Sequence, residues 1–163
     1  EKIFFLLIHN NNKKILDTLK SRCLIYKINL TFDNSVHITN KLINENILNL
    51  LNIDLINYYN TPGDFVNLIK FSKLNNLNLN ELNLGNFLSL LINEKYYKKD
   101  DFIKLSIFNF IELYFLKIFS QSTCKNNVIN FYSKFIRKIN DTNKFNLDHD
   151  SLFMELKSKI LNG

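Results

Sequence analysis

The sequence predicts a mainly α-helical protein that begins with a strip of α/β structure. After Asn29, apolar residues recur at the three- and four-residue spacing of amphipathic helices. The 163 residues include only three Gly and one Pro, fewer turn residues than a sandwich of many short strands requires. A third observation is the apolar run near Glu1, whose length and pattern are those of a strand. We therefore expect a strand–helix–strand strip, a three-helix unit and a bundle of four or five helices.

The start of the chain predicts the strip. The run Ile3-Phe4-Phe5-Leu6-Leu7-Ile8 is continuously apolar, as a strand buried on both faces of a sheet is. Residues 13–20 carry apolar side chains at helical spacing, and residues 24–28 alternate, which predicts a two-turn helix and a second strand. Because two strands alone are marginally stable in water, we expect their partners to precede Glu1 in a longer protein.

The rest of the chain predicts two groups of helices separated by a linker at residues 75–80. Thr61-Pro62 is the clearest helix start, because Thr is a good N-cap and Pro fits the first helical position. The first expected helix is capped by Asp33 or Asn34 and reaches about Asn44. The other expected helices cover residues 47–59, 61–74, 80–94, 100–120, 125–139 and 148–161.

The net positive charge of the chain is compatible with binding to phosphate groups, but it is not by itself evidence for such binding. The 21 Lys and Arg exceed the 15 Asp and Glu, and the isoelectric point is near 9.2. The lysines are spread singly or in pairs, and 28 Asn with no Ala indicate a codon bias that itself supplies Lys and Asn. A basic helical module that binds nucleic acid directly is therefore kept as an alternative interpretation.

Cysteine and histidine spacing predicts no metal site. Cys23 and Cys124 are far apart, no CxxC pair occurs, and the three His are scattered. Two lone cysteines are typical of a reducing compartment, so we expect a cytoplasmic location.

The most apolar stretch, residues 102–119, is interrupted by charged and polar residues, which favours a buried central helix over a membrane span.

The most informative segment joins the first predicted strand to the helix that follows it. Phe4-Phe5-Leu6-Leu7-Ile8-His9 precedes Ile15-Leu16-x-Thr18-Leu19-x-Ser21-Arg22-Cys23, and the chain has no Walker A loop, GxGxxG, HExxH or GxSxG motif. A buried strand, a polar turn and a short helix that ends in Ser-Arg-Cys resemble the sensor 1 to SRC segment of clamp-loader AAA+ proteins.

The resemblance implies that Arg22 is an arginine finger given in trans. It would complete the ATP site of a neighbouring subunit, with Ser21 and Cys23 in supporting positions of the SRC motif. A planar guanidinium donates two parallel hydrogen bonds and stays charged, which suits the charge that develops on a transferred γ-phosphate. His9 stands at the sensor 1 position, where ATPase subunits usually carry Thr or Asn.

The sequence departs from the pattern of ATPase subunits at two places, and at both it resembles the bacterial δ′ (delta-prime) type of DNA polymerase III subunit. One is His9 itself. The other is the absence of a basic residue from Tyr58 through Ile69, where ATPase subunits carry a second sensing arginine. Thr61-Pro62-Gly63 instead stands where δ′ subunits typically show Ser-Pro-Gly. The resemblance thus implies a stator that does not hydrolyse ATP. A hydrolysing γ/τ-type subunit is the alternative, and it would need a Walker A loop upstream.

The resemblance also implies a domain organisation and a set of partners. Residues 1–29 would end an AAA+ α/β domain, residues 30–75 would form a three-helix lid, and residues 76–163 would form a helical collar. The partners would be γ/τ ATPases and δ in a hetero-pentamer, with the sliding clamp and primer–template DNA reached through the assembly. We expect no catalysis, cofactor, metal or membrane contact from this chain alone, which would belong to a DNA polymerase holoenzyme.

Overall fold

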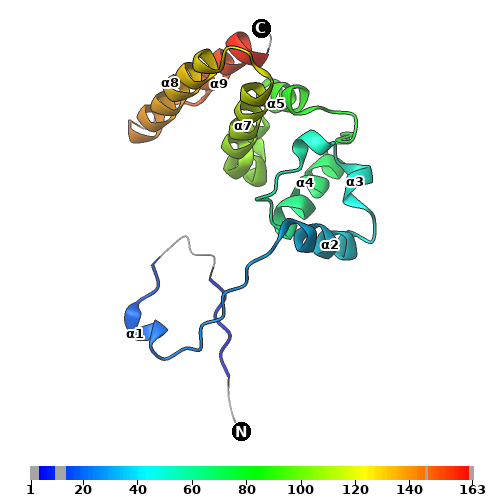
Figure 1. Cartoon of the computed structure of the whole chain (residues 1–163), viewed down its shortest axis with the longest axis vertical. Helices are drawn as coiled ribbons and strands as arrows, with labels where there is room; N and C mark the ends of the chain where they lie inside the picture. Colours follow the sequence, from blue (N-terminus) through cyan, green and yellow to red (C-terminus); the bar gives the residue numbers. More distant parts are fainter. Residues whose placement is uncertain (1–3, 10–13, 146, 162–163) are drawn as a thin grey trace. The chain divides into compact units, whose positions relative to one another are not determined.

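The computed structural model describes residues 4–9, 14–145 and 147–161, and this part of the chain is helical without a strand (Figure 1). The predicted fold class is therefore confirmed in its coarse form, a mainly helical protein. The chain divides into two compact units, an N-terminal unit of residues 1–30 and a helical unit of residues 31–163.

Neither predicted strand is formed in the described part of the N-terminal unit. Among its described residues, 4–9 and 24–30 form no hydrogen-bonded ladder. The apolar side chains of residues 4–8 are 61–91% exposed, and those of the second predicted strand are exposed as well. A strand exists only where a second segment accepts and donates its backbone hydrogen bonds, and no described residue of this unit does so. Ile3, in the first predicted strand, lies outside the described residues.

The predicted helix of residues 13–20 is shorter in the structure. Helix α1 covers only Asp17–Lys20, and the N-cap residue Leu16 has no side-chain oxygen to accept a backbone N–H. A single turn without a cap has little stability of its own, so α1 does not extend toward the preceding residues. Lys13, where the helix was expected to begin, lies outside the described residues.

The helical unit begins with two short helices, α2 (Phe32–Ile43) and α3 (Ile47–Leu50). The helix predicted for residues 47–59 is interrupted after α3, which the sequence pattern does not predict. Helix α2 starts at the N-cap Thr31 and ends at Asn44, which adopts the left-handed conformation at φ 58°. The predicted helix of residues 47–59 is wrong: α3 and the 3₁₀ turn η1 (Ile53–Leu55) replace it.

Asparagine side chains explain this interruption. Asn46, Asn52 and Asn57 each accept a hydrogen bond from a backbone N–H two residues further along the chain. Such bonds compete with the helical ladder and restart the chain as separate turns. The break also turns Leu51 and Leu55 into the core, where they are 2% and 0% exposed.

Helix α4 (Pro62–Leu74) begins where the sequence predicts. The Asp64 backbone N–H donates to Thr61 Oγ1 at 3.3 Å, and Asp64 Oδ2 accepts from the Thr61 N–H at 2.9 Å, which forms a capping box. Pro62 occupies the first helical position. A Cβ added to Gly63 would meet only Thr61 Oγ1, at 3.6 Å, so space alone does not require glycine there.

The predicted linker at residues 75–80 is held against the preceding turn. The Asn52 N–H donates to the Leu79 carbonyl and the Asn52 side chain donates to the Asn80 carbonyl, both at 3.0 Å. Leu79 is 1% exposed. The predicted boundary between lid and collar falls in this packed segment and stays a prediction.

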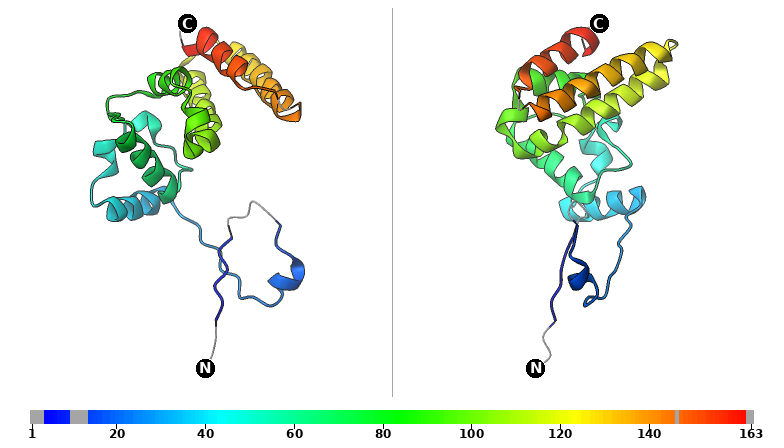
Figure 2. Two further views of the ribbon diagram at one scale, coloured as in Figure 1. Left: turned by 180° about the vertical axis from the view of Figure 1, so that it is seen from behind. Right: turned by 90° about the vertical axis from the view of Figure 1, so that its left-hand side faces the viewer.

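The remaining elements, α5 to α9 and η2, follow α4 and complete the helical unit (Figure 2). The structure starts the predicted 80–94 helix later, ends the predicted 125–139 helix later, and finishes with a π turn. The Asp100 side chain caps α7 by accepting from the Ile103 N–H at 2.9 Å, as its place in the sequence predicts. The elements are α5 (Leu84–Asn93), α6 (Tyr96–Lys99), α7 (Asp101–Gln121), α8 (Lys125–Lys144), α9 (Asp150–Leu156) and η2 (Lys157–Leu161).

One hydrophobic core runs through the helical unit. Phe87 on α5 is fully buried, and its ring lies edge-on to Phe71 of α4 at 6.4 Å and to Phe110 of α7 at 5.3 Å. Phe115 of α7 continues the core toward α8, where its ring contacts Phe135 at 5.9 Å. Because α4 and α7 share these contacts, the parts predicted as lid and collar pack together in the helical unit.

Candidate functional site

The Ser21-Arg22-Cys23 motif forms the turn that ends α1. The Ser21 hydroxyl donates to the Thr18 carbonyl at 3.1 Å, and the Arg22 N–H donates to the Leu19 carbonyl at 3.1 Å. The Cys23 N–H donates to the Lys20 carbonyl at 3.3 Å. These bonds satisfy the carbonyl groups that the last turn of a helix leaves open. Ser21 therefore holds the turn from which Arg22 projects.

Arg22 has an exposed side chain, and no carboxylate of the described residues compensates its charge. The ion pairs of the described residues all use lysines, and none reaches the Arg22 guanidinium. The nearest pair in the sequence, Lys20 with Asp17 at 3.9 Å, lies within α1 itself. An exposed guanidinium without a carboxylate partner keeps its donors available for a phosphate or carboxylate ligand.

The other predicted site residues have simpler surroundings. Cys23 is an exposed free thiol next to Arg22. His9 is exposed and follows the apolar residues 4–8. Ser21, Arg22 and Cys23 are thus brought together by one turn, whereas His9 belongs to a separate segment before α1.

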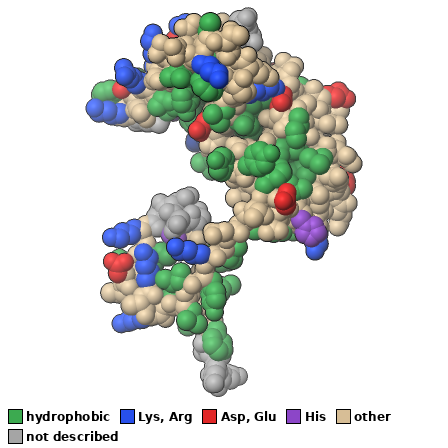
Figure 3. All heavy atoms as spheres, in the orientation of Figure 1, with side chains coloured by type: hydrophobic (Ala, Val, Ile, Leu, Met, Phe, Trp, Pro, Cys, Tyr) green, Lys and Arg blue, Asp and Glu red, His purple; other side chains and the backbone are tan. Residues whose placement is uncertain are grey.

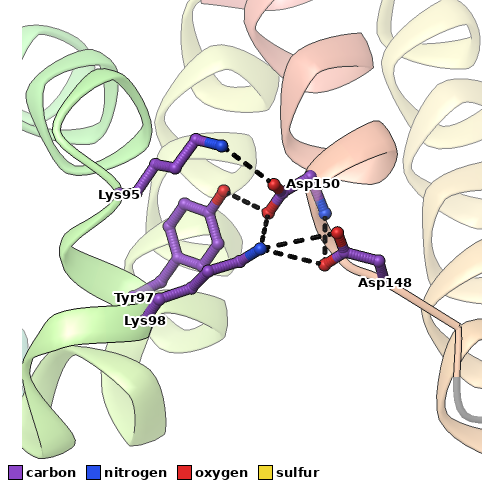
Figure 4. Close-up of polar contacts among 5 residues, drawn as sticks. All are labelled: Lys95, Tyr97, Lys98, Asp148 and Asp150. Atoms are coloured by element: carbon purple, nitrogen blue, oxygen red, sulfur yellow. Dashed lines mark hydrogen bonds and ion pairs between the residues drawn. The ribbon is translucent and has the colours of Figure 1, made fainter.

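The densest polar cluster of the described residues lies in the helical unit and links α6 to α9 (Figure 4). Asp150 Oδ1 accepts from the Tyr97 hydroxyl at 2.6 Å and pairs with Lys98 Nζ at 2.7 Å. Lys95 Nζ reaches the other Asp150 oxygen at 3.1 Å, and Lys98 also pairs with Asp148 at 3.3 Å. Asp150 is the centre of the cluster, since three donors converge on its carboxylate.

The sequence pattern does not reveal this cluster. Asp150 and Tyr97 are 53 positions apart, and no local spacing relates them. Lys95 reaches it because it adopts the left-handed conformation at φ 54°, which turns the chain between α5 and α6. The only signal in the sequence is acidic residues at the start of a predicted helix, and that pattern indicates a helix terminus rather than a partner.

The cluster shifts the pKa values of its members in the directions its contacts require. The hydrogen bonds from Lys98 and then from Tyr97 hold the pKa of the Asp150 carboxyl well below its usual range. Burial, followed by the hydrogen bond to Asp150, raises the pKa of the Tyr97 hydroxyl. The hydrogen bond to Asp150 also raises the pKa of Lys98. Each pKa shift favours the protonation state that the group has at neutral pH. The cluster therefore stabilises the packing of α9 against α6 and is structural rather than catalytic.

A second carboxylate, that of Glu155 on α9, links α8 to α9 through an ion pair in the same way. Glu155 pairs with Lys138 of α8 and with Lys159 at 2.7 Å. The hydrogen bonds from Lys138 and then from Lys159 lower the pKa of the Glu155 carboxyl. Like Asp150, Glu155 gives stability only while it is ionised.

Acid is therefore expected to loosen α9. Because the pKa of Asp150 is lowered by folding, its contribution is complete above the unfolded value, near 4, and is lost as pH falls through the folded value. At pH 7 the Asp150→Asn variant should be less stable by about 1 kcal/mol, because Tyr97 and two lysines lose a charged acceptor. Its deficit should shrink below about pH 4, where Asp150 of the unfolded wild-type chain binds a proton while Asp150 of the folded chain is still ionised.

Chemical unfolding of the chain between pH 7 and pH 3 measures this effect. Asp141→Asn is the matched control, because Asp141 is exposed on α8 and takes part in none of the ion pairs of the described residues. Stability curves for Asp150→Asn and wild type that stay parallel over this pH range would contradict the assignment.

The described residues contain no group of three or more His, Cys, Asp or Glu side chains arranged to hold a metal ion. None of the helices described is both long enough and apolar enough to cross a membrane.

Comparison with known protein families, with curated proteins and with solved structures finds no match for this chain.

Proposed function

We propose that this chain is the C-terminal part of a cytoplasmic clamp-loader subunit of δ′ type, a stator in DNA replication that does not itself hydrolyse ATP. In this proposal Arg22 enters the ATP site of a neighbouring γ/τ-type subunit. The chain acts within a hetero-pentamer that also contains δ and that places a sliding clamp on primer–template DNA.

The observation that carries the proposal is the state of Arg22. Its side chain is exposed at the end of a short helix, in the sequence context Ser21-Arg22-Cys23, and forms no ion pair with a carboxylate of the described residues. A residue that acts on a neighbour's phosphate needs these properties, because a guanidinium already paired within its own subunit would exchange one partner for another with little gain. Arginine is also rare here: Arg22 and Arg137 are the two arginines among 21 basic residues.

The exposed apolar segments on either side of Arg22 support the α/β part of the proposal. Residues 4–8 and the side chains of Leu24, Ile25, Tyr26 and Ile28 are exposed by 61% or more. Apolar surface of this extent is normally covered. In the proposed subunit, additional strands of a parallel sheet cover both segments and convert them into the strands that their sequence pattern favours.

The helical unit supports the lid and collar assignment less specifically. Short helices α2, α3 and α4 precede the longer α7 and α8, in the order that a small lid followed by a collar bundle requires. No basic residue between Tyr58 and Ile69 is available to contact a γ-phosphate from α4, which favours the stator over an ATPase subunit.

Reconstitution of the full-length protein tests this function. We expect it to assemble with purified γ/τ-type and δ subunits into a complex whose mass corresponds to a pentamer, measured by native mass spectrometry. Clamp loading onto primed DNA should require it, while the isolated full-length subunit should hydrolyse no ATP. Failure to assemble would refute the clamp-loader proposal, and hydrolysis by the isolated subunit would assign it to the γ/τ type instead.

A further inference from the structure

A hollow of about 270 Å³ lies between α7 and the loop that precedes α4. Its floor is apolar: Leu55, Leu68 and Phe110 are 0%, 1% and 6% exposed. Polar groups stand along its walls, and hydrophobic side chains gather on the face of the helical unit drawn in Figure 3. The polar wall residues include Asn57, Tyr59, Asn60, Asp64 and Glu112.

The charge of this hollow is opposite to that of the chain. Its lining contains the carboxylates of Asp64 and Glu112 and no Lys or Arg, although the chain carries a formal charge of +6. Asp64 is already an acceptor in the α4 capping box through Oδ2. Glu112 is exposed on α7 and belongs to none of the ion pairs of the described residues. The hollow therefore offers an uncompensated negative charge beside apolar surface.

Tyr59 adds an aromatic group to this wall. It is 89% exposed, yet its loop is held in place, because the Tyr59 N–H donates to Asn57 Oδ1 and the Asn60 N–H donates to the Asn57 carbonyl. A carboxylate, an exposed aromatic ring and an apolar floor together suit a cation on an aliphatic stem. Such a group places its stem on the floor and its charge against the carboxylate and the ring.

A second hollow of about 320 Å³ adjoins the first, since Leu113 and Leu116 line both. The charges at its edge, Asp54 and Lys117, neutralise each other as an ion pair, and the rest of its lining is apolar apart from Ser120. This hollow therefore suits an apolar side chain. A ligand that fills both hollows carries a cation and an apolar group within a short span.

We propose that the two hollows bind an extended segment of a partner protein that presents one Lys or Arg and one bulky apolar side chain. The cation occupies the hollow of Glu112 and Tyr59, and the apolar side chain occupies the hollow beyond Leu116. The inference concerns the helical unit and does not depend on the role proposed for Arg22.

Titration of the isotopically labelled chain with short peptides tests the proposal by NMR. The probes are the N-acetylated peptide amides Gly-Arg-Gly-Leu-Gly and Gly-Leu-Gly-Arg-Gly, each compared with a version that has Gln in place of Arg. We expect chemical-shift changes confined to residues 53–68, 84 and 102–120, and tighter binding of at least one Arg probe than of its Gln version. Glu112→Gln should weaken that Arg probe about two- to fivefold, the range of an exposed ion pair, and leave the Gln version unchanged.

Glu45→Gln is the matched control, because Glu45 is also an exposed glutamate but lies between α2 and α3, away from both hollows. It should bind all probes as wild type does. Equal affinity for the Arg and Gln versions, or shift changes outside the two hollows, would overturn the proposal. Argininamide that binds as tightly as the peptides would also overturn it, since the site would then serve a small cation alone.

Discussion

If Arg22 acts as proposed, its replacement by Ala or Lys in the full-length protein is expected to abolish most DNA-stimulated ATP hydrolysis at the neighbouring subunit's site. A trans-acting arginine stabilises the charge of the phosphoryl-transfer transition state and is worth about 10³-fold or more in rate. Lysine should substitute poorly, because a point charge cannot donate the two parallel hydrogen bonds of a guanidinium. The measurement is single-turnover hydrolysis by the reconstituted loader.

The design separates this role from a structural one. Arg22 is exposed and makes no ion pair with a described residue, so both variants should fold and assemble as wild type does. Arg137→Lys is the control, since Arg137 is the other arginine and lies exposed on α8. Hydrolysis that is unchanged in Arg22→Ala would remove the finger assignment, even if the complex still assembles.

The Phe87→Ala substitution is expected to destabilise the helical unit by about 3–5 kcal/mol. Phe87 is fully buried between the Phe71 and Phe110 rings. Its replacement by Ala removes the free energy gained by burying the ring and two aromatic contacts, and it leaves a cavity that the neighbouring side chains fill only in part. This loss is a large part of the roughly 5–15 kcal/mol that stabilises an ordinary domain. Urea unfolding of the chain, followed by far-ultraviolet circular dichroism, measures it.

Leu105→Ala is the control for this prediction, because Leu105 is on α7 but 80% exposed. It should change stability by less than about 0.5 kcal/mol. If α4 and α7 unfold in separate transitions in wild type, the single core assigned to the helical unit is wrong. A cost for Phe87→Ala as small as that for Leu105→Ala would contradict its place at the centre.

The elements that the sequence predicted well are those whose causes are local. Thr61, Pro62 and Asp64 determine the start of α4 through bonds that span three residues. Asp100 does the same for α7, whose length follows from a long apolar period. The helix predicted at residues 47–59 failed because its apolar period ignored three asparagines whose side chains capture backbone N–H groups.

The candidate sites also differ in whether their causes are local. The Ser21-Arg22-Cys23 turn closes with hydrogen bonds across three residues, and a motif in the sequence was enough to find it. The hollow around Glu112 was not predictable, because it forms where a loop near Tyr59 meets a helix about fifty positions later. Nothing near Glu112 in the sequence indicates that a pocket surrounds it.

By itself, then, the sequence determined the helical class, the capped starts of α4 and α7 and the turn that presents Arg22. Tertiary structure alone decided that Tyr97 and Lys98 meet Asp150 and that the parts on either side of residues 75–80 share one core. It also decided that the apolar residues 4–8 and 24–28 form no strands in this chain. The physical reason is range. Caps and turns are satisfied within a few residues, whereas strands, ion pairs and cores need partners that only the folded chain, or another segment, can bring into contact.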